Sequence, residues 1–146
     1  MSQASNYLEN KLTDHVLRGT TFTSPATIYV SLHTANPADD ATGTEVSGGA
    51  YARVAITANT TNWSGTQSAG STSASSGTGG ASSNNGAITF PTPSGGNWGV
   101  VTHFGIWDAL TTGNLLVFGA LGTSKTINDG DAAPAFAAAA LVNTIA

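Results

Sequence analysis

Short stretches in which apolar and polar residues alternate constrain this fold more than any other feature of the sequence. The clearest are TIYVSLHT at 27–34 and YARVAITA at 51–58. Successive side chains of a β-strand point to opposite faces, so this alternation predicts strands with one face in a core. In the first stretch, Ile28, Val30 and Leu32 are expected to face that core.

The region 98–121 predicts a β-hairpin. Two alternating apolar runs, WGVVTHFGIW and LLVFGAL, flank a group of turn-forming residues, as they do in two strands that are joined by a tight connection. Two shorter strands are expected beside it, AITF at 87–90 and TSKTI at 123–127. The hairpin residues that are expected to face the core are Val100, Phe104, Ile106, Leu116 and Phe118.

The N-terminal region predicts one helix over 5–18. Apolar residues recur there at helical spacing, at Leu8, Leu12 and Val16. Asn6 and Glu9 resemble a capping box, in which a polar side chain and an acidic one satisfy the first free backbone amides. Because a helix of about three turns is marginal alone, we expect it to pack on a surface within or between chains.

A Ser- and Gly-rich stretch at 64–86 interrupts the strand pattern. Of its 23 residues, 19 are Ser, Gly, Thr or Asn. Such a composition cannot supply much apolar core, and it favours flexible, solvated backbone. The sequence therefore predicts a long projecting loop at these positions.

The alanine-rich segment 134–142 has two interpretations. A helix that starts at Pro134 is favoured by the high helix propensity of alanine, with Asp131 as its cap. Alternation between Phe136 and Val142 favours a final strand instead. We interpret the segment as a strand.

Six or seven short strands separated by turn-rich loops predict a mostly β protein. This pattern is typical of a single-domain antiparallel β-sandwich or small barrel, here with a short N-terminal helix. A chain of 146 residues is long enough to bury one core. We expect an N-terminal helical element at 1–19, followed by a β-sandwich domain at 20–146 that carries the Ser/Gly-rich loop 64–86.

The chain is unusually poor in charge. It has four Lys and Arg and eight Asp and Glu, whereas a quarter of the residues of a typical soluble domain are charged. The four cations are scattered and form no basic patch, which argues against a nucleic-acid partner. A neutral surface favours packing against other subunits, so we expect a homo-oligomer. No signal peptide or membrane-spanning run is found, and no membrane partner is expected.

Few residues have the types and spacing that chemistry requires. His15, His33 and His103 lie far apart, and none has a second ligand at metal-binding spacing. No serine lies in a nucleophile-elbow motif, and Asp39 and Asp40 belong to a turn-rich loop. Cysteine is absent, which excludes thiol chemistry. The sequence thus predicts no catalytic residues, no metal site, no cofactor and no enzyme activity.

An ordered series of segments resembles a family of small structural proteins of tailed phages, often described as tail-fibre-like or as virion proteins. No single motif is specific, but the series covers nearly the whole chain. Its segments are SNYLENKLTDHVLRGT, PATIYVSLHTANP, TGTEVSGGAYARVAI, AITFP, NWGVVTHFGIWDALTTGNLLVFGAL and TSKTINDGD. The resemblance implies a component of a virion, assembled in the host cytoplasm, without cofactor or catalytic residues.

Two places in a virion fit these features. Small size, low charge and the lack of coiled-coil or fibrous repeats favour a capsid decoration (cement) protein that stabilises the head by multimeric contacts. The alternative is a tail-fibre or tail-tip component, including one that binds host glycans through Trp63 or Trp98. The expected partners are the major capsid protein or tail proteins of the same virion, and further copies of this chain.

Six residues are candidate contacts with such partners. Three lie on the predicted helix and three on strand faces that are expected to point outward, although each could instead belong to the core of its own chain. They are Tyr7, Leu8, Leu12, Tyr29, Tyr51 and Trp107.

Overall fold

Strands dominate the computed structural model, which describes residues 2–145. Met1 and Ala146, the outer ends of the predicted segments 1–19 and 20–146, lie outside the described residues, and the boundary at residue 19 stays a prediction. The helix is α1 (Asn6–Leu17). The strands are β1 (Ser2–Ala4), β2 (Thr27–His33), β3 (Val54–Thr57), β4 (Ala81–Ser83), β5 (Ile88–Thr89), β6 (Gly99–Trp107), β7 (Leu115–Ile127), β8 (Ala135–Phe136) and β9 (Val142–Thr144). The predicted mostly β class with a short N-terminal helix is confirmed.

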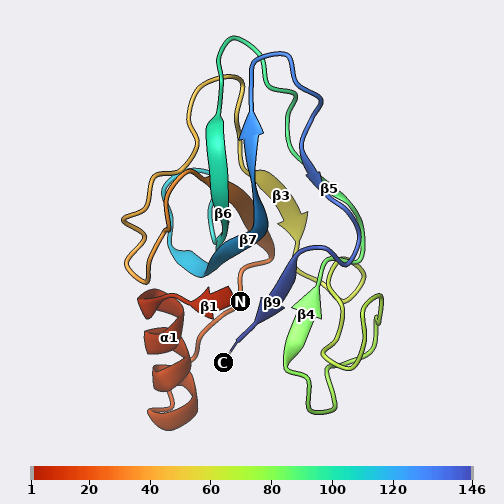
Figure 1. The fold of residues 1–146 in the computed structure, drawn as a ribbon. Coiled ribbons are helices and arrows are strands. Elements are labelled where there is room, and N and C mark those ends of the chain that lie inside the picture. Colours follow the sequence, from red (N-terminus) through yellow and green to blue (C-terminus); the bar gives the residue numbers. More distant parts are fainter. Residues whose placement is uncertain (1, 146) are drawn as a thin grey trace.

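A five-stranded antiparallel sheet with the order β1-β7-β6-β2-β3 forms the centre of the fold (Figure 1). Two antiparallel ribbons, β4–β9 and β5–β8, complete it. The β5–β8 ribbon packs against the sheet through the Phe136 ring, which lies 6.3 Å from that of Phe104 on β6. Phe90, which follows β5, adds a ring 6.2 Å from that of Phe136. The arrangement is β-sandwich-like, as the alternation predicts.

The N-cap of the helix lies one residue earlier than predicted, at Ser5 and not at Asn6. Ser5 is the N-cap, and its hydroxyl accepts a hydrogen bond from the amide of Leu8 at 3.3 Å. Ser5 is extended because its own amide still pairs with the carbonyl of Leu116 at 2.9 Å, next to the β1–β7 ladder. The prediction that Asn6 caps the helix was therefore wrong, since pairing of β1 with β7 fixes where the helix starts. Within residues 2–145, no helix has both the length and the apolar character needed to cross a bilayer.

In the middle of the central sheet, where β2 pairs with β6, both faces are buried, whereas the sequence predicts strands with only one buried face. On one face Val30 and Ile106 pair across β2 and β6, and both belong to the main apolar core. On the other face Ser31, opposite Gly105, is fully buried. The loop between β2 and β3 covers this second face, with Ala41 packed against a smaller core of Trp107, Leu115 and Phe118.

Two irregularities in the β6–β7 ladder change which hairpin residues face the core. Residues 121–124 of β7 bulge opposite a single residue of β6, between the pairs Val101↔Lys125 and His103↔Ala120. Val100 is consequently 50% exposed while its neighbour Val101 is 1% exposed. The prediction that Val100 shares a buried face with Phe104 and Ile106 was wrong, because a bulge reverses the alternation.

The second irregularity lies between Ile106 and Trp107 and shifts the start of β7. As a result Leu116 and Phe118 lie in different apolar clusters, not in a shared core as expected. The segment 123–127, predicted as a separate strand, is the end of β7, which resumes its pairing with β6 at Lys125.

The alanine-rich segment 134–142 is neither a helix nor one continuous strand. β8 ends at Phe136, and a turn with Ala139 at a φ of 63° leads to β9. The buried side chain of Asn84 holds this turn. Its Nδ2 donates to the carbonyl of Ala137 at 2.8 Å, and its Oδ1 accepts from the amide of Leu141 at 2.8 Å. A polar residue distant in sequence thus overrides the local propensities.

The Ser/Gly-rich stretch 64–86 matches its prediction only in part. Residues 64–80 contain neither helix nor strand, but Ala81–Ser83 form β4 and pair with β9. Ser64 and Ser83 are buried, and the Ser64 hydroxyl accepts from the Ser83 amide at 2.9 Å. Hydrogen bonds between small polar residues therefore anchor both ends of this loop.

Candidate functional site

A buried polar cluster on one face of the central sheet gathers the residues that chemistry most often uses. The Ser31 hydroxyl lies 2.7 Å from Nε2 of His33 and accepts a hydrogen bond from Nε1 of Trp107 at 2.8 Å. The His33 and Trp107 rings stack with their centroids 6.2 Å apart. A Cβ at Gly105 would lie 2.7 Å from Ser31 Oγ, so glycine there leaves the space that the cluster occupies.

The electrostatics of His33 differ from those of a catalytic base. Burial, with a further contribution from the positive charge of Arg53, lowers the pKa of His33 to about 4. The ring is thus neutral at physiological pH. Its Nδ1 has no hydrogen-bond partner among the described residues. In a nucleophile relay, by contrast, the histidine donates its Nδ1 proton to a carboxylate.

Arg53 fastens the tip of the β6–β7 hairpin to this cluster. Its guanidinium forms a bidentate pair with Glu45 at 2.7 and 2.9 Å and lies 3.9 Å from the centroid of the Trp107 ring. It also donates to the carbonyls of Ala109 and Thr112 at 2.8 and 2.9 Å. The Arg53 side chain is only 7% exposed. These contacts use its donors within the chain and leave little of them for a partner.

Tyr51 extends the same network. Its hydroxyl donates to Glu45 at 2.9 Å and accepts from the amide of Leu32 at 2.9 Å. Burial, with the negative charge of Glu45 beside it, raises the pKa of Tyr51 well above its ordinary value. The phenol therefore stays protonated and serves as a fixed hydrogen-bond donor.

This cluster is closed to solvent. Ser31 is 0% and His33 1% exposed, so no substrate reaches them without opening of the sheet. The other histidines make local contacts: His15 Nδ1 accepts from the amide of Phe22, and His103 Nδ1 bonds to Thr102. Within residues 2–145, no group of three or more potential metal ligands gathers. The network is best understood as a lock between the strands and the hairpin tip.

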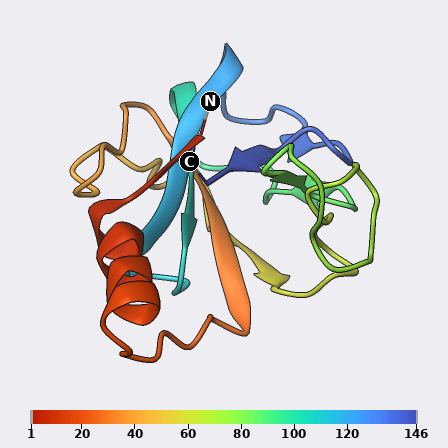
Figure 2. The ribbon, with the colours of Figure 1, turned by 90° about the horizontal axis from the view of Figure 1, so that it is seen from below.

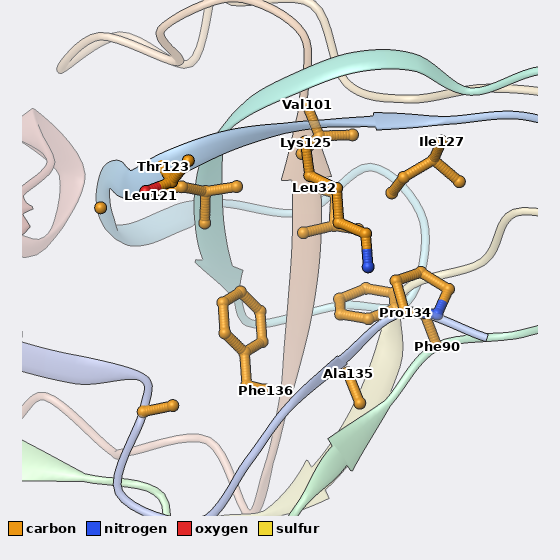
Figure 3. A pocket seen from close by; sticks show the side chains of 12 residues that line it. Leu32, Phe90, Val101, Leu121, Thr123, Lys125, Ile127, Pro134, Ala135 and Phe136 are labelled. Atoms are coloured by element: carbon orange, nitrogen blue, oxygen red, sulfur yellow. The ribbon is translucent and has the colours of Figure 1, made fainter. Parts of the chain in front are cut away.

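An apolar hollow opens on the opposite face of the sheet, between the bulged part of β7 and the β8 ribbon (Figure 3). Its volume is about 270 Å³. Leu121 and Phe136 line its mouth, and the floor includes the buried side chains of Leu32 and Val101. The bulge at residues 121–124 shapes one wall.

A second hollow of about 230 Å³ continues the first toward β9. The two share Leu121, Gly122, Phe136 and Ala140 among their lining residues, and we call them together the apolar groove. Lys125 is the one charged residue that lines it within the described part of the chain. In Figure 3 its nitrogen points into the hollow. The groove thus offers an apolar surface with a single cation.

The C-terminal end of α1 is a second apolar surface. Val16 and Leu17 are 72% and 78% exposed, more than the other large apolar side chains in residues 2–145. The helix rests on β1 and β7 through its first turns, where Leu8 is buried. Figure 1 shows the rest of α1 extending below the sheet. We call Val16 and Leu17 the free end of α1.

The six predicted contact residues are mostly engaged within the chain. Leu8 and Trp107 are both 7% exposed and belong to apolar clusters. The other four are half-buried and pack against those clusters; they are Tyr7, Leu12, Tyr29 and Tyr51. Whether any of them contacts a partner stays a prediction. Sequence analysis missed the apolar groove, because its walls meet only through the bulge and the turn before β9.

The tryptophans considered as a sugar platform differ in their exposure. Trp98 is 4% exposed, and its Nε1 donates to the carbonyl of Gly49 at 2.8 Å. Its Cδ1 would also lie 2.8 Å from a Cβ added at Gly49, so backbone covers part of the ring. Trp63 is half-buried. A buried ring offers no open face on which a sugar could stack, so Trp98 acts as a core anchor.

The family comparison covers almost the whole chain. A family model described as "Podophage GP4 fiber I protein gp80" matches residues 3–144. No curated protein matches the chain.

Proposed function

Because the chain belongs to the family of podophage GP4 fiber I protein gp80, and is thus a structural protein of a phage virion, we propose that it is a tail-fibre component. The observation that carries this proposal is the match over residues 3–144 to a family described by a fibre protein. That description supports the tail-fibre alternative better than the capsid decoration role that small size and low charge favour.

The proposed mode of action is contact between subunits, without catalysis. The sealed Ser31–His33–Trp107 cluster supports this, because the reactive side chains that the fold gathers are used for internal hydrogen bonds. Two accessible apolar features are the apolar groove and the free end of α1. When many subunits are tethered to one particle, weak contacts are reinforced because each neighbour is present at high effective concentration.

The proposed partners are further copies of this chain and other tail proteins of the same virion, with assembly in the host cytoplasm. The scarcity of charged residues supports self-association, because few charges must be desolvated when two such surfaces meet.

Labelling of intact particles tests this proposal. We would insert an epitope tag at Gly77, which is exposed and where an added Cβ meets nothing within 4 Å. Particles would then be decorated with a tag-specific antibody fragment and averaged by electron microscopy. The proposal predicts label along appendages of the tail. Label distributed over the capsid surface in a lattice would instead support the decoration role and contradict the fibre proposal.

A further inference from the structure

The structure assigns an occupant to the apolar groove: we infer that the free end of α1 from a second copy docks there, so that copies join head to tail. The inference rests on the proposed function in that a fibre needs a contact that repeats. The donor surface is Val16 and Leu17, and the acceptor surface is the groove around Leu121, Phe136 and Lys125.

The apolar parts of the two surfaces complement each other. Val16 and Leu17 are neighbouring apolar side chains that project from a helix end. The groove is concave, and its walls include Leu121, Phe136 and Ala140. Burying a Val or Leu side chain that is otherwise exposed stabilises the contact. A convex apolar end and a concave apolar groove on the same chain are what a repeating contact requires.

The charges of the two surfaces also match. The C-terminal end of a helix carries a partial negative charge from carbonyls without intrahelical partners. Lys125 points into the groove, and no acidic residue lines the groove within residues 2–145. A docked helix end would place its carbonyls near this ammonium group. Arg18, which follows Leu17, is paired with Asp14 at 3.3 Å, which offsets part of its charge.

The positions of the two surfaces favour an open assembly. In both Figure 1 and Figure 2, α1 and the β5–β8 ribbon, which borders the groove, lie at opposite sides of the molecule. A contact between two different surfaces is heterologous, so a copy whose groove is filled still has a free helix end that can dock in the groove of the next copy. Such a contact builds a ring if the rotation closes and a filament if it does not.

Disulfide trapping tests the contact directly, because the chain has no native cysteine. The variants are Leu17→Cys on the donor and Thr123→Cys on the acceptor, both at exposed positions. Each single variant carries one thiol, so a mixture of the two forms the mixed disulfide fastest where the helix end of one chain rests in the groove of another. The double variant should give a ladder of oligomers on a non-reducing gel.

The matched control replaces the acceptor with Leu110→Cys, which is 50% exposed on the hairpin tip outside the groove. We expect the Leu17→Cys and Thr123→Cys mixture to form the mixed disulfide at least about tenfold faster than the control mixture, as contact requires. Equal rates in the two mixtures would overturn the inference. If the epitope label lies on the tail but the two mixtures form disulfides at equal rates, the fibre role is supported and only this contact is rejected.

A second measurement uses no cysteine. In sedimentation of the purified chain, Leu17→Asp should weaken self-association by about tenfold or more, as loss of a central apolar anchor does. Thr13→Asp, also exposed on α1 but outside its free end, should change it by less than about twofold. Equal effects of the two substitutions would contradict docking through Leu17.

Discussion

The two faces of the central sheet differ in what they leave accessible. One face holds Ser31, His33 and Trp107 in a network closed to solvent. The other carries the main apolar core and opens at the apolar groove between β7 and the β8 ribbon. The reactive side chains are thus locked inside, while the accessible hollow is almost without chemistry. This difference supports the proposal that the protein works through contact, with the polar cluster holding the strands and the hairpin tip together.

Removal of the Arg53 charge, which fastens the hairpin tip, should cause the largest loss of stability on the sealed face. Arg53→Met would leave Glu45, which is 24% exposed, without its bidentate partner. We expect a loss of about 4 kcal/mol in the free energy of unfolding, measured by denaturant titration. The control Arg18→Met removes a pair whose arginine is 74% exposed and should cost less than about 0.5 kcal/mol. Similar losses in both variants would contradict the locking role of Arg53.

A methyl group added inside the polar cluster should cause the next largest loss of stability. In Gly105→Ala the added Cβ would lie 2.7 Å from Ser31 Oγ and 2.9 Å from Trp107 Nε1. Overpacking and disrupted hydrogen bonds should destabilise the fold by about 3 kcal/mol in chemical denaturation. The matched control is Gly122→Ala, where an added Cβ meets nothing within 4 Å. A Gly105→Ala protein as stable as this control would show that the cluster is loosely packed.

Acid should weaken the sealed face through His33. Because burial lowers the pKa of His33 from 6.5 to about 4, the unfolded chain binds its proton at a higher pH than the folded one. Stability contributed by the neutral ring is therefore complete above about pH 6.5 and is lost as the pH falls toward 4. We expect about 2 kcal/mol of this loss between pH 7 and pH 5.

Comparison of unfolding free energies at the two pH values with those of His33→Gln isolates this contribution. The variant keeps every carboxylate, so the part of the pH dependence that it lacks belongs to His33. An unchanged pH dependence in the variant would mean that folding does not shift the pKa of His33.

The smallest effect is expected where the bulge turns a strand residue outward. Val100→Lys should cost less than about 0.5 kcal/mol, because Val100 is 50% exposed. Its neighbour provides the contrast: Val101 is 1% exposed, and Val101→Lys should cost more than about 3 kcal/mol. Thermal unfolding of the pair checks the register of β6. A greater loss of stability in Val100→Lys than in Val101→Lys would support the simple alternation that the sequence predicts and contradict the bulged register.

The residues at which sequence analysis succeeds and fails follow a physical pattern. Alternation in 27–34 predicts β2 and its core side chains, because a strand paired without irregularity keeps its period of two. It fails at Val100, where a bulge in the partner strand sets the register. It fails also in the alanine-rich segment, where Asn84 holds a turn that no local propensity indicates.

The candidate surfaces show the same limit. Val16 belongs to the predicted apolar stripe of the helix, but its exposure depends on how little of α1 the sheet covers. The apolar groove joins residues from β7 with residues beyond β8, which are distant in sequence. Only the tertiary structure brings them together.

Hydrogen–deuterium exchange of the protein in intact particles, compared with the free purified chain, tests the central claim most directly. If this virion protein acts through its open face, assembly should slow exchange at 120–127 and 134–142, which border the apolar groove, and at the end of α1. Exchange in the sealed cluster on β2 and β6 should stay the same. Protection that is gained elsewhere, with the groove and the helix end unchanged, would contradict the account.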